Sequence, residues 1–181
     1  MTSTIRALAI VALAAASLVG CAAAPATKEA QSEILRDGTT ALRDWGKMDP
    51  GVETLATKSY GYAMFPEVTK GGLVFGGAHG RGVVYERGQH VGYADLTEGS
   101  FGLQVGGQTY SELIVFEHKD ALDRFKQNRL DFSANASAVI AKTGVATNAR
   151  FVDGVAVVIR PITGAMAEAA VGGQQLKYFS K

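Results

Sequence analysis

The side chains that could carry catalysis are scattered along this sequence. His79, His90 and His118 lie far apart and form no His-x3-His pair, the spacing that brings two imidazoles to one zinc ion. Ser100 follows Gly99 directly, so this segment is not a nucleophile elbow. The remaining acid–base candidates have no partner at a useful spacing: Asp95, Glu98, Glu112 and Glu117. We therefore expect no enzymatic activity, no bound metal and no cofactor.

Cys21, the single cysteine, ends an apolar N-terminal run. Arg6 gives this segment a positive start, and the stretch from Ala7 to Leu18 is interrupted only by Ser17. A run of this length is too short to span a bilayer and is typical of a cleaved secretory signal. An ordinary signal peptide that happens to contain a cysteine is the alternative interpretation.

The tetrapeptide Leu18-Val19-Gly20-Cys21 resembles the lipobox of bacterial lipoproteins. The resemblance implies that residues 1–20 are removed and that Cys21 becomes the lipid-attachment site, carrying diacylglycerol and an amide-linked fatty acid such as palmitate. Ala22 stands where an aspartate would favour inner-membrane retention in many Gram-negative lipoproteins. The resemblance therefore implies a lipid-anchored protein of the cell envelope, in the outer membrane facing the periplasm.

The charge balance excludes one class of partner. The chain has 18 basic and 17 acidic residues, and residues 1–20 contain one arginine and no acid, so the rest is formally neutral. Bulk nucleic-acid binding requires a strong basic excess, so we expect no nucleic-acid partner. The 161 residues after the signal suit one domain, and residues 21–28 form a short tether before it.

The periodicity predicts helices first and strands afterwards. Lys28 to Lys47 has apolar residues at helical spacing, although Gly38 weakens this prediction by about 1 kcal/mol relative to alanine. Asp49-Pro50 predicts an N-cap followed by proline at the first position of a second helix that reaches about Lys58. A third helix is predicted from Lys119 to Asn128.

Short strands are predicted beyond Tyr60, each between turns or glycines. Glu86-Arg87-Gly88-Gln89 predicts a hairpin turn, and Gly76 to Gly82 predicts a bend and turn. The strands expected after these turns are Phe101–Val105, Leu113–Phe116, Ser133–Ala141, Phe151–Arg160, Ala165–Val171 and Gln175–Phe179. The glycine concentration between residues 71 and 107 favours strong curvature. We expect an α+β fold in which an N-terminal helical pair packs on a strongly curved, mostly antiparallel, glycine-rich, barrel-like sheet.

Three phrases in order resemble the SYLF domain. They are Tyr62-Ala63-Met64-Phe65-Pro66 with Lys70-Gly71-Gly72, then Gly76 to Val83, then Gly99 to Gln108. The resemblance covers about residues 29–181. It implies a non-catalytic lipid-binding module, because eukaryotic members bind membrane phosphoinositides with the help of an amphipathic N-terminal helix, and some bind actin filaments.

Two sets of side chains are candidates for an anionic lipid headgroup. Lys70 and Arg81 are expected on glycine-rich bends, where little bulk would shield a bound anion, and exposed loop charges are the alternative. Arg36, Arg43 and Lys47 recur at helical spacing, but the neighbouring acids favour a solvated helix face. Trp45 fits either a lipid interface or a core anchor, and its large area favours the core.

Two functions remain open. The favoured one is a membrane-anchored lipoprotein whose SYLF-like domain binds lipid in the bacterial envelope. The alternative is a structural or protein-interaction module that recruits an envelope protein partner without a lipid ligand.

Overall fold

The computed structural model describes residues 25, 27–133, 138–140 and 149–181. The N-terminal part of this range is helical. Helix α2 (Lys28–Met48) begins at Thr27, whose hydroxyl accepts a hydrogen bond from the Ala30 amide at 3.2 Å. Asp49 caps α3 (Pro50–Lys58) by accepting from the Gly51 amide at 3.0 Å. Both helices, and the Asp49-Pro50 start of the second, are as predicted.

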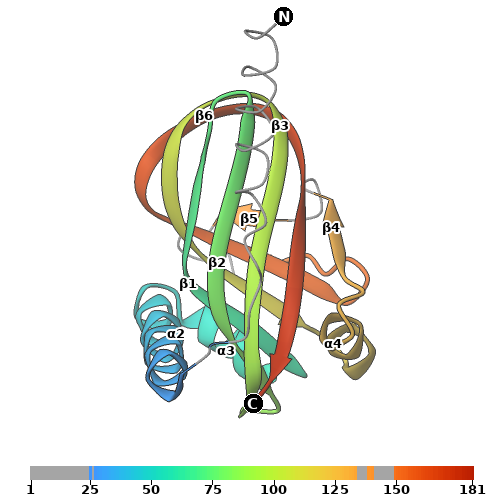
Figure 1. The fold of residues 1–181 in the computed structure, drawn as a ribbon. Coiled ribbons are helices and arrows are strands. Elements are labelled where there is room, and N and C mark those ends of the chain that lie inside the picture. The colour runs from blue at the N-terminus through green and yellow to red at the C-terminus, as the bar shows by residue number, and fades with distance from the viewer. Residues whose placement is uncertain (1–24, 26, 134–137, 141–148) are drawn as a thin grey trace, which may run out of the picture.

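Most of the remaining chain forms one sheet (Figure 1). Its strands are β1 (Gly61–Gly72), β2 (Phe75–Glu86), β3 (Gln89–Phe116), β4 (Asp131–Ser133), β5 (Ala138–Ile140) and β6 (Val155–Ser180). Pairing is antiparallel except between β5 and β6. The β2–β3 hairpin turns at Arg87-Gly88, which both have positive φ, so the predicted turn is confirmed.

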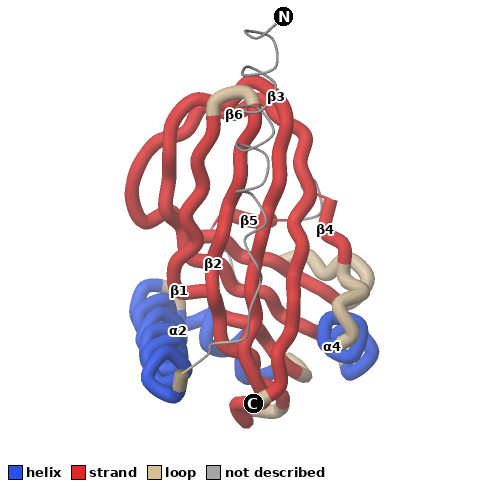
Figure 2. Tube along the Cα trace, in the orientation of Figure 1, coloured by secondary structure: helices blue, strands red, loops and turns tan. Residues whose placement is uncertain are grey.

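Two long strands of this sheet, β3 and β6, bend back on themselves in an arch. The first half of β3 pairs with β2 and its second half pairs with β1, so the β1–β2 hairpin lies between the two arms of β3. Strand β6 follows β3 in register from Gly92↔Ser180 to Phe116↔Val155. Figure 2 shows these strands curving over the top, with the helices at the lower end.

The α+β class and the mostly antiparallel curved sheet are confirmed, but the barrel-like expectation is wrong because the sheet is not closed. Among the described residues, the outer side of β6 pairs only with the short strands β4 and β5. The curvature predicted from glycine runs along β3 and β6. This curvature bends the two strands, but it does not bring the two edges of the sheet together.

Two apolar cores cover the two faces of the sheet. The helix-side core packs Trp45 of α2 and Val52 of α3 against Tyr62, Met64 and other strand residues. The inner core lies within the arch and against α4 (Lys119–Lys126), whose Leu122 and Phe125 are fully buried. Alternate residues of β3 point into different cores, as the period of a strand requires.

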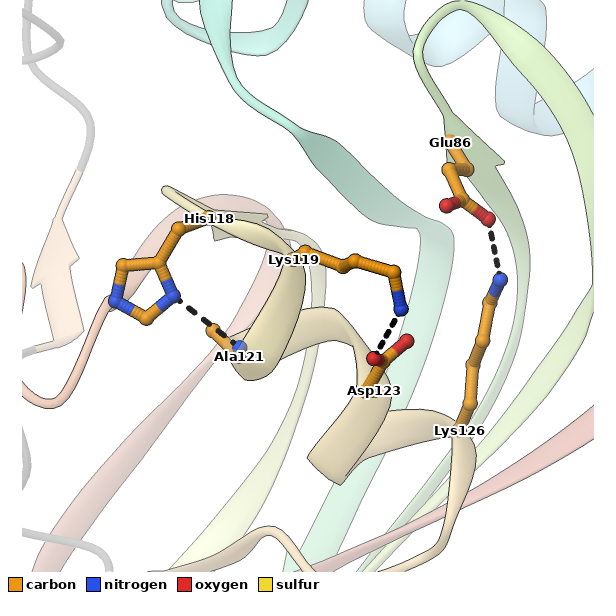
Figure 3. A network of polar contacts seen from close by, with 6 residues as sticks. All are labelled: Glu86, His118, Lys119, Ala121, Asp123 and Lys126. Atoms are coloured by element: carbon orange, nitrogen blue, oxygen red, sulfur yellow. Dashed lines mark hydrogen bonds and ion pairs between the residues drawn. The ribbon is translucent and has the colours of Figure 1, made fainter.

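Polar contacts fix α4 at the lower end of the sheet (Figure 3). His118 caps the helix, because its Nδ1 accepts from the Ala121 amide at 3.3 Å. Lys126 pairs with Glu86 of β2, and Lys119 pairs with Asp123 one turn along the helix. His118 is therefore a structural residue in this fold.

Candidate functional site

The end of the sheet opposite the helices carries a group of exposed apolar side chains. The turn between β1 and β2 supplies Leu73 and Val74, which are 67% and 51% exposed, and β2 begins with Phe75 at 76%. The arch of β3 adds Phe101 and Val105, at 62% and 54%. We call these five residues the apolar tip; Figure 2 shows its turn at the top of the molecule.

Contacts between the two segments hold the tip together. The Gly102 amide donates to the Val74 carbonyl at 3.0 Å, and the rings of Phe75 and Phe101 lie 5.1 Å apart. An open hollow of about 720 Å³ is lined by Gly72, Leu73, Val74, Phe75 and Gly106. Five large apolar side chains in water are unusual for a folded domain, and a contiguous apolar patch marks an interaction surface.

Glycines form the base of the tip. Gly71 is in register with Gly77 and Gly107, and Gly77 with Gly99, so one row of glycines crosses the sheet. A Cβ built on Gly99 would meet nothing within 4 Å. Gly102 and Gly106 have φ values of 148° and 123°, so the backbone itself favours glycine at these two positions.

The sequence indicated neither the tip nor its turn. Gly76 to Gly82, expected as a bend, lies inside β2, and the chain reverses at Leu73-Val74. Glycine and polar residues are the usual turn signals, and a turn built from two exposed aliphatic residues lacks them. The available signal was the position of Leu73 to Phe75 between two glycine pairs with no polar residue among them.

The two preferred headgroup candidates lie below the tip with carboxylates beside them. Lys70 Nζ is 2.7 Å from Glu98 Oε1, and each of these side chains is 10% exposed. Arg81 Nε is 3.6 Å from Asp95 Oδ1. Burial raises the pKa of the Asp95 carboxyl and the Arg81 charge opposes that shift. The structure thus does not bring Lys70 and Arg81 together on one open surface.

A second buried carboxyl lies near the Lys70–Glu98 pair. Glu112 is fully buried on the inner face, and Gln174 Nε2 donates to both of its oxygens at 3.1 Å. Burial raises the pKa of Glu112 to about 8, the Gln174 hydrogen bonds oppose the shift, and the Glu98 charge adds to it. The carboxyl is therefore mainly protonated at pH 7.

Of the headgroup candidates on α2, the three cations lie on the surface and Trp45 lies in the core. Arg36 and Lys47 are exposed and pair with acids of the same helix, at 3.0 Å for Arg36–Asp37 and 2.7 Å for Lys47–Asp44. Arg43 is also exposed. Trp45 is 2% exposed in the helix-side core, as its size favoured.

Three further sequence features concern the N-terminal signal segment, a possible metal site and membrane-spanning helices. Cys21 and the signal segment lie outside the described residues. Among the described residues, no His, Cys, Asp or Glu cluster has the arrangement of a metal site. No helix in the described ranges combines the length and apolarity needed to cross a membrane.

The comparisons identify the C-terminal half of this fold. Residues 97–177 match the sequence model of the family described as "Ysc84: Las17-binding protein actin regulator". Residues 97–177 are therefore similar in sequence to the Ysc84 (SYLF) domain. The resemblance drawn from the sequence phrases is confirmed for residues 97–177, which contain the phrase from Gly99 to Gln108. The Ysc84 match begins in β3 and ends in β6, so it includes Phe101 and Val105 of the tip.

A curated relative extends the Ysc84 likeness toward the N-terminus. The chain is 27% identical over 150 residues to "Beta cell expansion factor A" of Aeromonas veronii, which covers 82% of this chain. The aligned part is 57% of that relative, so this chain corresponds to little more than half of its length.

Proposed function

We propose that this chain is a membrane-anchored lipoprotein of the bacterial cell envelope whose Ysc84 (SYLF) domain binds lipid without catalysing a reaction. The observation that carries the lipid part is the apolar tip, five exposed side chains at the end of the molecule remote from the helices. The lipobox-like sequence at Cys21 supports the anchor, and the Ysc84 match supports the domain type.

The tip suits a bilayer better than it suits water. Phe75 and Phe101 expose most of their surface, and burial of a phenylalanine side chain contributes about 1.5–3 kcal/mol. Two such side chains give enough free energy for a measurable partition into the acyl-chain boundary. An anchored protein needs only a weak second contact, because one lipid attachment already concentrates it at the membrane.

The proposal is tested by co-sedimentation with liposomes, using protein from which residues 1–21 have been removed. We expect the parent to bind and Phe75→Ser/Phe101→Ser to bind at least about tenfold more weakly, from the two lost apolar side chains. Val152→Ser is the matched control, because Val152 is 49% exposed and precedes β6, whose first residue pairs with Phe116 away from the arch. Equal binding by parent and tip variant, with both folded by circular dichroism, would refute the lipid contact.

The anchor needs a separate experiment. We expect Cys21→Ser to stop incorporation of labelled fatty acid and to release the protein from the membrane fraction. The outer-membrane location is tested by density separation of the two membranes. Undiminished labelling of Cys21→Ser would show that the chain is not acylated at this residue.

A protein partner is the second candidate, and the family description favours it because it names a binding protein and an actin regulator. A surface pocket of about 450 Å³ supports this alternative; it lies between α3 and Phe151 and includes Leu55, Lys58 and Glu117. Under this alternative an envelope partner binds the folded domain, and liposomes do not.

A further inference from the structure

The apolar tip has no cation of its own. Residues 71–78 and 99–111 contain no Asp, Glu, Lys, Arg or His. On β6, the only formal charge between Arg160 and Lys177 is Glu168, which is acidic and in register with Gln104 of the β3 arch. A surface built to bind anionic headgroups would place cations here, and this end of the sheet does not.

The Lys70–Glu98 pair marks the lower boundary of the segments 71–78 and 99–111, which carry no charged residue. Lys70 is in register with Ala78 and Gln108, and Ala78 with Glu98, so the Lys70–Glu98 pair lies one row below the glycines. Strand β1 continues for only two residues beyond Lys70, and strands rise about 3.3 Å per residue, so the β1–β2 end, which has no cation, is roughly 10 Å tall with its turn. That height matches the ~5–10 Å to which interfacial elements enter a membrane.

Four of the candidate headgroup cations lie beside acids. The Lys70 ammonium contacts the Glu98 carboxylate, and Arg81 faces Asp95. The α2 cations Arg36 and Lys47 contact acids of their own helix. A lipid phosphate at any of these cations would have to compete with a carboxylate that the fold already supplies.

From these three observations we infer that the apolar tip binds the hydrocarbon boundary of a lipid membrane irrespective of headgroup charge. The inference rests on the proposed function and specifies its ligand. The ligand is the surface of a loosely packed or highly curved bilayer, and it is not an anionic headgroup. Apolar burial is not screened by salt, whereas attraction between exposed charges is. Binding should therefore respond to lipid packing and not to ionic strength.

The test uses a fluorescent reporter in the same protein without residues 1–21, so that an acyl chain on Cys21 does not contribute to vesicle binding. Phe75→Trp places an indole at the tip, and the native Trp45 is buried and gives a constant background. We expect its emission to shift to the blue and to be quenched by acyl-brominated lipid on vesicles of pure phosphatidylcholine. The dissociation constant should change less than about threefold when phosphatidylglycerol or salt is added, and should fall on smaller, more curved vesicles.

Two matched variants locate the effect. Val152→Trp reports from the other end of the sheet and should remain unquenched, and Arg81→Gln in the Phe75→Trp background should bind unchanged. Quenching only on vesicles that contain phosphatidylglycerol, reversed by salt, would overturn the inference while leaving membrane binding intact. No response to any vesicle would refute the proposed function as well. A blue shift with protein concentration in the absence of lipid would show that a second copy of the chain covers the tip.

Discussion

Glu112 shows how a single side chain makes the stability of this protein depend on pH. Its carboxyl lies in the interior of the sheet, where its pKa is about 8 against an ordinary value of 4.5. Between these two values the folded state retains a proton that the unfolded state has released. The free energy of unfolding therefore falls as the pH rises through this window, at most by about 1.4 kcal/mol per pH unit.

Glu112→Gln tests this relation. We expect the variant to lose the Glu112 contribution to the slope between about pH 4.5 and pH 8 and to exceed the parent in stability at neutral pH. Urea unfolding at a series of pH values measures the difference, with the exposed Glu67→Gln as control. Parallel curves for parent and Glu112→Gln would show that this carboxyl is not buried as described.

For the Lys70–Glu98 pair we expect the stability losses of single and double variants not to add. Removing one partner leaves the other charge buried and uncompensated, which typically costs about 3–5 kcal/mol. We expect Lys70→Met to be strongly destabilised and the double variant Lys70→Met/Glu98→Leu to recover most of the loss. Thermal unfolding of the two single variants and the double variant measures the coupling. Additive losses would show that the two side chains do not interact.

In helix α2, the helix propensity of Gly38 gives the wrong sign for its effect on the stability of the protein. Gly38 weakens the helix in isolation, but a Cβ at this position would lie 2.5 Å from Val83 Cγ2 of β2. Glycine therefore allows the helix to approach the sheet closely. This reason depends on a contact between residues 45 positions apart, so it was not visible in the periodicity of the helix.

The corresponding prediction is that Gly38→Ala destabilises the protein although alanine is the better helix former. Overpacking of this kind costs roughly 1–3 kcal/mol, which exceeds the ~1 kcal/mol gained in helix propensity. Gly38→Ala/Val83→Ala should recover part of the loss, because the smaller side chain makes room for the new methyl group. A more stable Gly38→Ala single variant, measured by urea unfolding, would contradict the close approach.

The helix caps and turns that the sequence predicted correctly are those that depend on neighbouring residues in the chain. The caps at Asp49 and the turn at Arg87-Gly88 depend on adjacent residues, and both were predicted. The strands were predicted as short pieces, whereas β3 and β6 run for 28 and 26 residues. Glycines interrupt the apolar pattern there, and pairing between distant strands keeps the backbone extended through them.

At the scale of the whole molecule, the candidate site was predicted only in part. The similarity of residues 97–177 to the Ysc84 (SYLF) domain could be inferred, but the preferred headgroup candidates were Lys70 and Arg81, which the fold places beside Glu98 and Asp95. Which charges are paired depends on strand register. The apolar tip likewise exists only because the arch of β3 brings Phe101 next to Phe75.

The pairing of β3 with β6 also sets the order in which the protein can fold. Strand β3 is in register with β6 from Gly92↔Ser180 to Phe116↔Val155, so the last strand borders the sheet along its whole length. A ribosome releases the N-terminal elements first, and they must wait for residues 155–180 before the arch can form. During that interval the edge of β3 that later pairs with β6 has no partner strand, and an unpaired strand edge can pair with another chain.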